Sequence, residues 1–328
     1  MKKLLFIILI FSVLFSVNKT GTSAAKFLSI NPGAKAIGMG GAFTSISDDL
    51  SSIYWNPSGI ARLGVNSFYF NHSEWLADIN YDFIAIAIPM TEAYSIGFSA
   101  TYLSMGEMEV RRYGDEHTGE KFRVGSYAIS AVWAMNLTNR FSIGFSGKYI
   151  REKIGNSSAT GFAIDVGTLF NTIMGPQLGV NISNFGPKME MSGSDLLVNA
   201  DVSNIEGNNP NINAELSTDS FDLPLVLRVG ISDKLEYGGL VFLWSIDAVN
   251  PIDNSEYLNT GFEVNFWDRV YLRTGSKSIF MNDREELYTV GLGTKLKLFS
   301  GQNFKLDYSY QILKYLPSTI QFSIGLSY

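Results

Sequence analysis

The residue types that most often carry out chemistry are scarce in this sequence of 328 residues. It contains no cysteine and only two histidines, His72 and His117. Without thiolates there can be no disulfide framework, cysteine nucleophile or thiolate metal site, and two histidines leave little for a histidine-based metal site. No serine, histidine and aspartate form a recognisable catalytic arrangement. We therefore predict that the protein is not an enzyme and holds no metal or other cofactor.

Two short motifs near the N-terminus could bind ligands in another context. The run GMGG at 38–41 has the composition of a phosphate-binding loop. Such a loop needs a preceding strand within a βαβ unit, which is absent here. The adjacent carboxylates Asp48 and Asp49 could form a metal pair. We favour the interpretation that they cap the start of a short helix.

Most charged residues within the later, alternating part of the sequence lie on one face of the pattern. From residue 65 onward, apolar residues alternate with Gly, Ser, Ala and Asn in stretch after stretch, which indicates β-strands. Asp82, Arg123 and Arg151 take the apolar face, and each lies at the end of a stretch. The charged residues that share the small, polar face are Lys148, Asp165, Arg228, Asp247, Glu263, Arg273, Lys295, Lys297, Lys305 and Asp307.

The alternating stretches predict fourteen strands. Their lengths suit tilted strands that cross a membrane, which need about 9 to 11 residues. The expected bounds are 65–73, 80–88, 93–104, 122–135, 140–152, 160–171, 177–185, 223–232, 238–248, 256–266, 269–277, 286–298, 302–312 and 318–328.

The polar face distinguishes a membrane barrel from a soluble sandwich. In a sandwich that face meets water and is heavily charged, but charged residues make up only 17% of this sequence. In an outer-membrane barrel the apolar face meets lipid and the polar face lines the lumen. We therefore predict an all-β fold, a 14-stranded antiparallel transmembrane β-barrel whose small lumenal residues pack against something inside. Arginine at lipid-facing Phe145 or Ile324 should then be tolerated less well than at Ser146 or Ser323.

Connection lengths predict the orientation of this barrel. Connections after even-numbered strands are short turns, whereas the two longest, 106–121 and 186–222, follow odd-numbered strands. Outer-membrane barrels have short periplasmic turns and longer external loops. We expect the protein to lie in the outer membrane, in contact with its lipid and lipopolysaccharide, with both termini in the periplasm.

The net charge of -6 gives no electrostatic footprint for nucleic acid.

The residues before the first strand form two parts. Residues 1–24 have a basic start, an uncharged run over 4–17 and small residues before Ala25, which predicts a signal peptide cleaved after Ala24. Residues 25–64 do not alternate and are rich in glycine. We expect this segment to form a plug in the lumen of a barrel that covers 65–328.

The expected plug segment also carries a family motif. Its runs 33–43 (GAKAIGMGGAF), Asp48-Asp49 and 54–60 (YWNPSGI) resemble the N-terminal signature of the PorV/PorQ family, within the FadL-like superfamily of 14-stranded outer-membrane barrels. Lys35 and Ser58 depart from it, because arginine and alanine are usual there. In FadL-like proteins this segment plugs the lumen. The residues that match as plug motif are Gly33, Ala36, Gly38, Met39, Gly40, Gly41, Ala42, Asp48, Asp49, Asn56 and Pro57.

The resemblance continues through the chain, in the run LGVNISNFG at 178–186, in Leu223-Pro224-Leu225 and in Asp307-Tyr308. It implies a component of type IX protein secretion that shuttles or attaches client proteins at the cell surface. The implied partners are the translocon, an attachment complex or the signal domains of clients, which we expect to meet the loops 106–121 and 186–222. The alternative is a FadL-type transporter of long-chain fatty acids or other hydrophobic compounds, with a hydrophobic small molecule in the lumen.

Overall fold

The computed structural model describes residues 21–114, 118–200, 212–281, 283–298 and 301–328. The predicted signal peptide therefore lies almost wholly outside the described residues, and so does His117. In the part of the chain that is described, no helix is long and apolar enough to cross a membrane.

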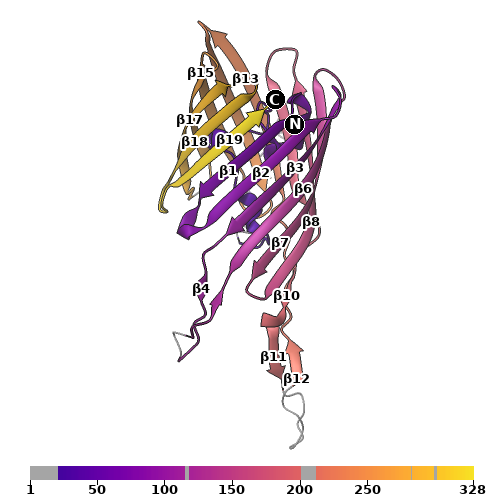
Figure 1. Cartoon of the computed structure of the whole chain (residues 1–328), viewed down its shortest axis with the longest axis vertical. Helices are drawn as coiled ribbons and strands as arrows, with labels where there is room; N and C mark the ends of the chain where they lie inside the picture. The colour runs from indigo at the N-terminus through magenta and orange to yellow at the C-terminus, as the bar shows by residue number, and fades with distance from the viewer. Residues whose placement is uncertain (1–20, 115–117, 201–211, 282, 299–300) are drawn as a thin grey trace, which may run out of the picture.

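Fourteen antiparallel strands form one closed ring (Figure 1). Successive wall strands pair along the chain, and β1 (Ser67–Glu74) pairs with β19 (Thr319–Ser327) to close the ring. The other wall strands are β2 (Asn80–Pro89), β3 (Tyr94–Ser104), β6 (Val124–Asn136), β7 (Phe141–Ile154), β8 (Ser157–Asn171), β9 (Gln177–Phe185), β13 (Val226–Tyr237), β14 (Leu240–Pro251), β15 (Tyr257–Phe266), β16 (Val270–Ile279), β17 (Glu286–Lys297) and β18 (Asn303–Leu313).

All fourteen predicted strands are confirmed, and the largest shifts of a boundary are in β13. The strand predicted over 223–232 begins three residues later, as β13 at Val226, and runs on to Tyr237. Pro224 has no backbone N–H to donate to a ladder. Leu225 instead donates its N–H to the Leu223 carbonyl at 2.8 Å, so regular pairing starts only after this turn.

The two faces of the wall meet different surroundings. Outward side chains in the middle of strands are apolar and exposed, as for Ile129 (53%) and Ile164 (52%). Inward charges are buried, as for Asp165 and Asp247, both 0% exposed. The apolar face is therefore the outer face, as a transmembrane barrel requires.

The two ends of the barrel differ. At the hairpin end, β4 (Met108–Glu109) pairs with β5 (Lys121–Phe122), and β10 (Met191–Gly193) extends the edge of β8. There η4 (Ser194–Leu196) leads into a projecting hairpin of β11 (Leu197–Ala200) and β12 (Ile212–Glu215) (Figure 1). At the opposite, turn end, the strands join by short turns and the chain ends at Tyr328.

Short helices fill the inside of the ring (Figure 1). They are η1 (Lys26–Ser29), α2 (Ala34–Gly38), α3 (Ser52–Trp55) and η2 (Pro57–Arg62), all from residues 25–64, which we call the N-terminal segment. Outside the segment, η3 (Leu76–Asp78) joins β1 to β2.

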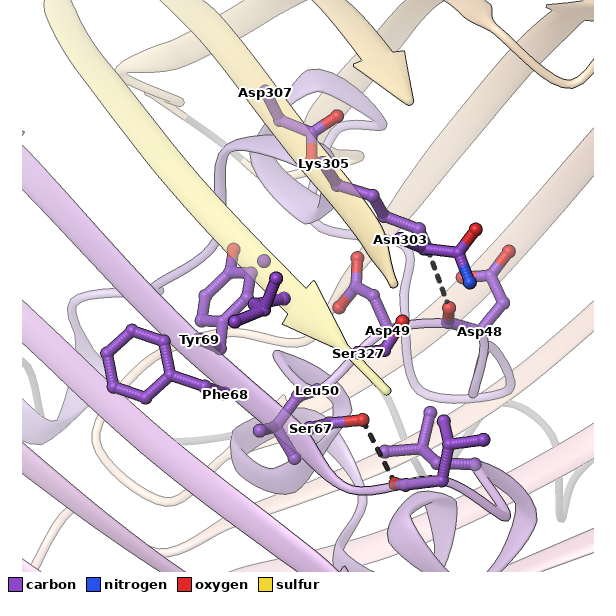
Figure 2. Close-up of a pocket in the computed structure, with 14 residues that line it drawn as sticks. Asp48, Asp49, Leu50, Ser67, Phe68, Tyr69, Asn303, Lys305, Asp307 and Ser327 are labelled. Carbon is purple, nitrogen blue, oxygen red and sulfur yellow. Dashed lines mark hydrogen bonds between the residues drawn. The ribbon is translucent and has the colours of Figure 1, made fainter. Parts of the chain in front are cut away.

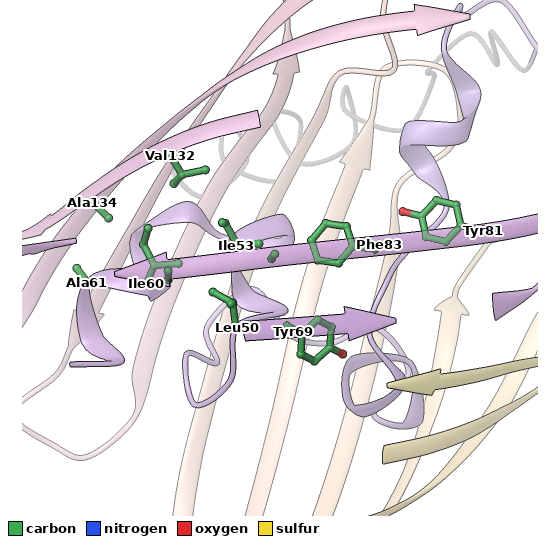
Figure 3. Close-up of a cluster of buried hydrophobic side chains, with 11 residues drawn as sticks. Leu50, Ile53, Ile60, Ala61, Tyr69, Tyr81, Phe83, Val132 and Ala134 are labelled. Carbon is green, nitrogen blue, oxygen red and sulfur yellow. The ribbon is translucent and has the colours of Figure 1, made fainter. Parts of the chain in front are cut away.

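The N-terminal segment runs the length of the lumen. Just before it, Ser23 forms a bridge with Asp222 at the hairpin end. Its last turn reaches the turn end, where Leu63 shares a cavity with Ser67 and Ser327. Between these points its apolar residues pack on the inward face of the wall, and Figure 3 shows one such cluster. The labelled members are Leu50, Ile53, Ile60 and Ala61 of the segment with Tyr69, Tyr81, Phe83, Val132 and Ala134 of the wall.

Candidate functional site: the lumen and the N-terminal segment

The glycine motif of the segment lies directly against glycines of the wall. Gly40 has a φ of +67°, a conformation that side chains rarely adopt, and its N–H donates to Thr289 Oγ1 at 2.9 Å. A Cβ on wall residue Gly275 would lie 2.2 Å from the Gly40 nitrogen, and one on Gly261 would lie 2.4 Å from the Met39 carbonyl. The segment and the wall therefore fit backbone to backbone.

The rest of the glycine motif is also held by the wall. Gly33 precedes α2 and donates its N–H to Asn71 Oδ1 at 3.2 Å. Ser245 Oγ donates to the Ala42 carbonyl at 2.6 Å. The other members are buried as well, namely Ala36, Gly38, Met39 and Gly41.

We expect Gly275→Ala to loosen the segment, because the added methyl group would meet the backbone of Gly40 rather than a flexible side chain. Overpacking of this kind costs about 1–3 kcal/mol. The temperature at which the barrel unfolds on a heated gel should fall. Gly147→Ala is the matched control, since a Cβ there meets nothing within 4 Å. Equal unfolding temperatures for the two variants would contradict the proposed fit.

The Asn56-Pro57 turn ties the segment to β8. Asn56 Nδ2 donates to the carbonyls of Thr44 and Thr168, each at 2.9 Å. Its Oδ1 accepts from Ser58 Oγ at 2.6 Å, at the start of η2, where Pro57 is the first residue. Ser58, one of the departures from the family motif, thus has a defined partner. A Cβ on wall residue Gly167 would lie 2.1 Å from Asn56 Oδ1, so only glycine fits opposite this turn.

Two lumenal charges of the wall contact the segment directly. Asp247 Oδ2 accepts the N–H groups of Phe43 at 2.9 Å and Thr44 at 2.8 Å. The Arg228 guanidinium lies over the rings of Tyr54 and Trp55, 5.8 and 5.6 Å from their centroids. A buried charge needs such compensation, because it has lost the water that would otherwise stabilise it.

Several other lumenal charges form ion pairs within the wall, and one bonds to the segment. Within the wall, Lys148 Nζ lies 2.6 Å from Asp165 Oδ2. Arg273 lies between Glu263 Oε2 at 2.5 Å and Asp307 Oδ1 at 2.6 Å. Lys305, also predicted to face the lumen, donates to the Asp48 carbonyl at 2.9 Å.

Lys35 connects this network to the segment. Its ammonium lies 2.7 Å from Asp48 Oδ1 and 3.6 Å from Glu263 Oε2. Burial acts to lower the pKa of Lys35, but the attraction of Asp48 and Glu263 outweighs it and raises that pKa above its usual value. Lys35 therefore stays charged inside the barrel. The sequence identified it only as a mild departure from the family motif.

Asp48 and Asp49 have different surroundings at the turn end, in the corner that Figure 2 shows. Burial would raise the pKa of Asp48, but the Lys35 ammonium holds it well below its usual range. Burial raises the pKa of Asp49, whose Oδ1 accepts the Ser51 N–H at 2.8 Å just before α3. A cavity of about 110 Å³ beside them is also lined by Tyr69. Asp48 thus forms an ion pair, and Asp49 forms a contact at the start of a helix. The described residues contain no cluster of three or more His, Asp and Glu suited to a metal.

The charges predicted on the apolar face lie toward the hairpin end. Asp82 Oδ1 is 2.7 Å from His72 Nδ1 across β1 and β2. Arg123 pairs with Glu107 Oε1 at 2.5 Å, beside the hairpin of β4 and β5. These pairs are at least one third exposed and lie away from the lumen contacts.

Solved structures with the same fold include several channels. The toluene transporter TodX of Pseudomonas putida aligns with a TM-score of 0.59 at 11% identity, covering 90% of this chain and 97% of that one. A FadL homologue of Pseudomonas aeruginosa aligns with a TM-score of 0.55 at 11% identity, covering 96% and 98%. The monoaromatic hydrocarbon channel CymD gives a TM-score of 0.56 at 14% identity, covering 91% and 97%. A comparison with curated protein sequences found no match.

The ring of strands and these neighbours define the class: the protein is a 14-stranded β-barrel with a FadL-like fold. Residues 16–202, more than half of the chain, match the family described as type IX secretion system protein PorV. The chain belongs to this PorV family, as the N-terminal motif predicted.

Proposed function

We propose that this chain is a non-enzymatic component of type IX protein secretion, which receives exported proteins and passes them to their place on the cell surface. Family membership supports the secretion system. The packing of the lumen supports protein handling over solute transport. The cavity between segment and wall that is lined by Leu28, Ile53, Tyr81 and Phe83 among others measures only about 10 Å³. Larger cavities between them, of about 110 to 250 Å³, are lined by charged residues such as Asp48. Pockets for small molecules usually measure about 300–1,000 Å³.

The alternative is a transporter of fatty acids or other hydrophobic compounds. The fold favours it, since two neighbours are named as a toluene transporter and a hydrocarbon channel. Transport through this lumen would require the N-terminal segment to move, because Phe43, Ile53 and Trp55 are at most 3% exposed. We therefore keep it as the second candidate.

In this proposal the hairpin end faces outward and the short turns face the periplasm. Tyr328 then lies on the periplasmic side. The expectation that both termini are periplasmic needs revision, because Ala25 lies at the hairpin end, where its N–H donates to Glu152 near the end of β7. With cleavage after Ala24, the two ends of the mature chain are on opposite sides.

The outward surface offers apolar side chains to a partner. On the projecting hairpin, Leu197 is 49% exposed and Ile212 is 42% exposed, and Leu216 just beyond it is 53% exposed. Exposed apolar residues on a protruding element often mark a protein contact. The sequence treated 186–222 as a loop without strands, and β10, β11 and β12 correct that view.

Replacing residues 196–216 by a short turn should preserve barrel assembly and reduce co-purification of client or attachment proteins, because it removes the exposed apolar hairpin. Uptake of fatty acids should not change. Serine in place of Ile173 and Met174, which are 82% and 92% exposed in a short turn at the opposite end, is the control for loss of exposed apolar side chains. If the first variant retrieves the same partners in the same yield, the hairpin is not the docking surface.

Deletion of the gene distinguishes the two candidate functions. Surface and periplasmic proteomes of the deletion strain would be compared with those of the parent. Secreted clients that accumulate in the periplasm support the secretion role. Normal secretion with lost uptake of a hydrophobic nutrient supports transport instead.

A further inference from the structure

The N-terminal segment begins beside two acidic side chains at the hairpin end. Ala25 is 1% exposed, and its N–H donates to Glu152 Oε2 at 3.0 Å. The side chain of Lys26 pairs with Asp253 at 2.5 Å. The two residues that follow are fixed in an apolar cluster, where Phe27 is 5% and Leu28 is 4% exposed. The backbone nitrogen of Ala25 is therefore held in a defined place.

Glu152 is incompletely compensated in the uncleaved chain. It lies in β7 and is partly buried. Across the residues that the structure describes, no lysine, arginine or histidine side chain forms an ion pair with it, and its hydrogen-bond donor is the neutral amide of Ala25. A partly buried carboxylate is better stabilised by a cation than by one neutral donor. This site therefore suits a positive charge at the position of the Ala25 nitrogen.

The backbone at Ala25 has an unfavourable conformation. Ala25 has a φ of +49°, in the left-handed region that alanine avoids. The angle φ exists only while residue 24 is attached. Cleavage between Ala24 and Ala25 would remove this restriction, and it is the bond at which the sequence predicts removal of the signal peptide.

We propose that Glu152 binds the α-ammonium group of Ala25 once the signal peptide has been removed after Ala24. Hydrolysis breaks the Ala24–Ala25 amide with one water molecule, whose hydroxyl joins the Ala24 carbonyl carbon while the nitrogen of Ala25 gains hydrogen. The freed amine takes up a further proton at neutral pH, and Ala24 leaves as a carboxylate. The neutral donor thus becomes a cation with three donor hydrogens facing Glu152.

Maturation therefore changes how the segment is held at the hairpin end. The uncleaved chain contacts the long connection through Ala24, whose N–H donates to the Asp222 carbonyl at 2.9 Å. Cleavage removes this contact and strengthens the one to the wall at Glu152. The connection that ends at Asp222 then keeps only its apolar contact with the segment, where Met189 packs in the cluster of Phe27 and Leu28, while the segment stays fixed to β7. This inference does not depend on the secretion role.

The test measures the reactivity of the N-terminal amine in the mature protein, purified as the folded barrel. An amine-reactive reagent is applied at neutral pH, and the labelled N-terminal peptide is quantified by mass spectrometry. We expect the mature chain to begin at Ala25. Its amine should react at least about tenfold more slowly in the folded barrel than in the unfolded chain, because only the unprotonated amine reacts and the ion pair keeps it protonated.

Two variants separate this ion pair from simple burial. Glu152→Gln should bring the labelling rate towards that of the unfolded chain, whereas Glu107→Gln, at the same end but paired with Arg123, should leave it unchanged. A different mature N-terminus, equal labelling of folded and unfolded protein, or an unchanged rate in Glu152→Gln would each overturn the proposal. If Glu152→Gln does not assemble, the pH dependence of labelling in the folded wild-type protein decides: an ion pair moves the rise in rate to a higher pH than in the unfolded chain, whereas simple burial slows labelling without moving that rise.

Discussion

Arginine in place of Ile129 is expected to prevent assembly of the barrel, whereas arginine in place of Ile88 is expected to be tolerated. Both isoleucines point outward, at 53% and 42% exposure, from the strands β6 and β2. Ile129 lies in the middle of its strand, and Ile88 is the last residue but one of its strand, at the turn end. Arginine costs about 2–4 kcal/mol at the membrane midplane and about 0–1 kcal/mol near the interface. Heat-modifiable migration of the protein in membrane fractions measures the assembled fraction.

The choice of control matters for this experiment. From sequence, arginine at lumen-facing Ser146 or Ser323 should be better tolerated than at Phe145 or Ile324. The structure buries Ser146 at 2% and Ser323 at 0% exposure, so an arginine there would displace packed neighbours rather than enter open water. The comparison of mid-strand with strand-end positions avoids this difficulty. Equal assembly of Ile129→Arg and Ile88→Arg would mean that the outer face does not meet hydrocarbon.

Replacing residues 33–60 by a flexible Gly/Ser linker is expected to open the lumen while the barrel still inserts. Strand pairing involves only wall residues, so it does not need the segment. The lumen would lose Phe43, Ile53, Trp55 and Ile60, all at most 3% exposed, and water would fill the space. Conductance in planar bilayers and sensitivity of cells to large antibiotics should both rise.

The variant with shortened 196–216 is a suitable control, because it removes a similar length of chain outside the ring of strands. It should leave conductance low. If the linker variant assembles and its permeability equals that of the parent, something other than the N-terminal segment closes the lumen.

The strands of the wall could be predicted because each strand has one face towards lipid and one towards the lumen. Apolar and polar residues therefore alternate along it, and this pattern is visible in a short stretch of sequence. The short strands β4, β5 and β10 to β12 escaped prediction because two to four residues are too few to show a period. They form through contacts with more distant parts of the chain, as where Met191 of β10 pairs with Ala159 of β8. The late start of β13 could have been anticipated from Pro224, which cannot donate to a ladder.

The inward charges were predictable as a set, but their partners were not. Alternation places Asp247 on the lumenal face, yet its partner Phe43 is 204 residues away in sequence. The same holds for Gly275, whose fit to Gly40 depends on where the segment lies along the lumen. Lys35 is the clearest omission. A lone basic residue in a buried, glycine-rich segment requires an acidic partner, and that signal was available in the sequence.

The meeting of the first and last wall strands sets an order on assembly. The seam runs from Ser67 opposite Ser327 to Glu74 opposite Ile320. Until β19 is delivered, the other strands can form only an open sheet whose concave face is still accessible from the side. Residues 25–64 precede β1 and lie inside the ring, so after closure they could enter only through an end of the barrel. Closure of the seam is therefore the step that encloses the segment. Without the last strand, the wall would stay open and the segment would not be enclosed.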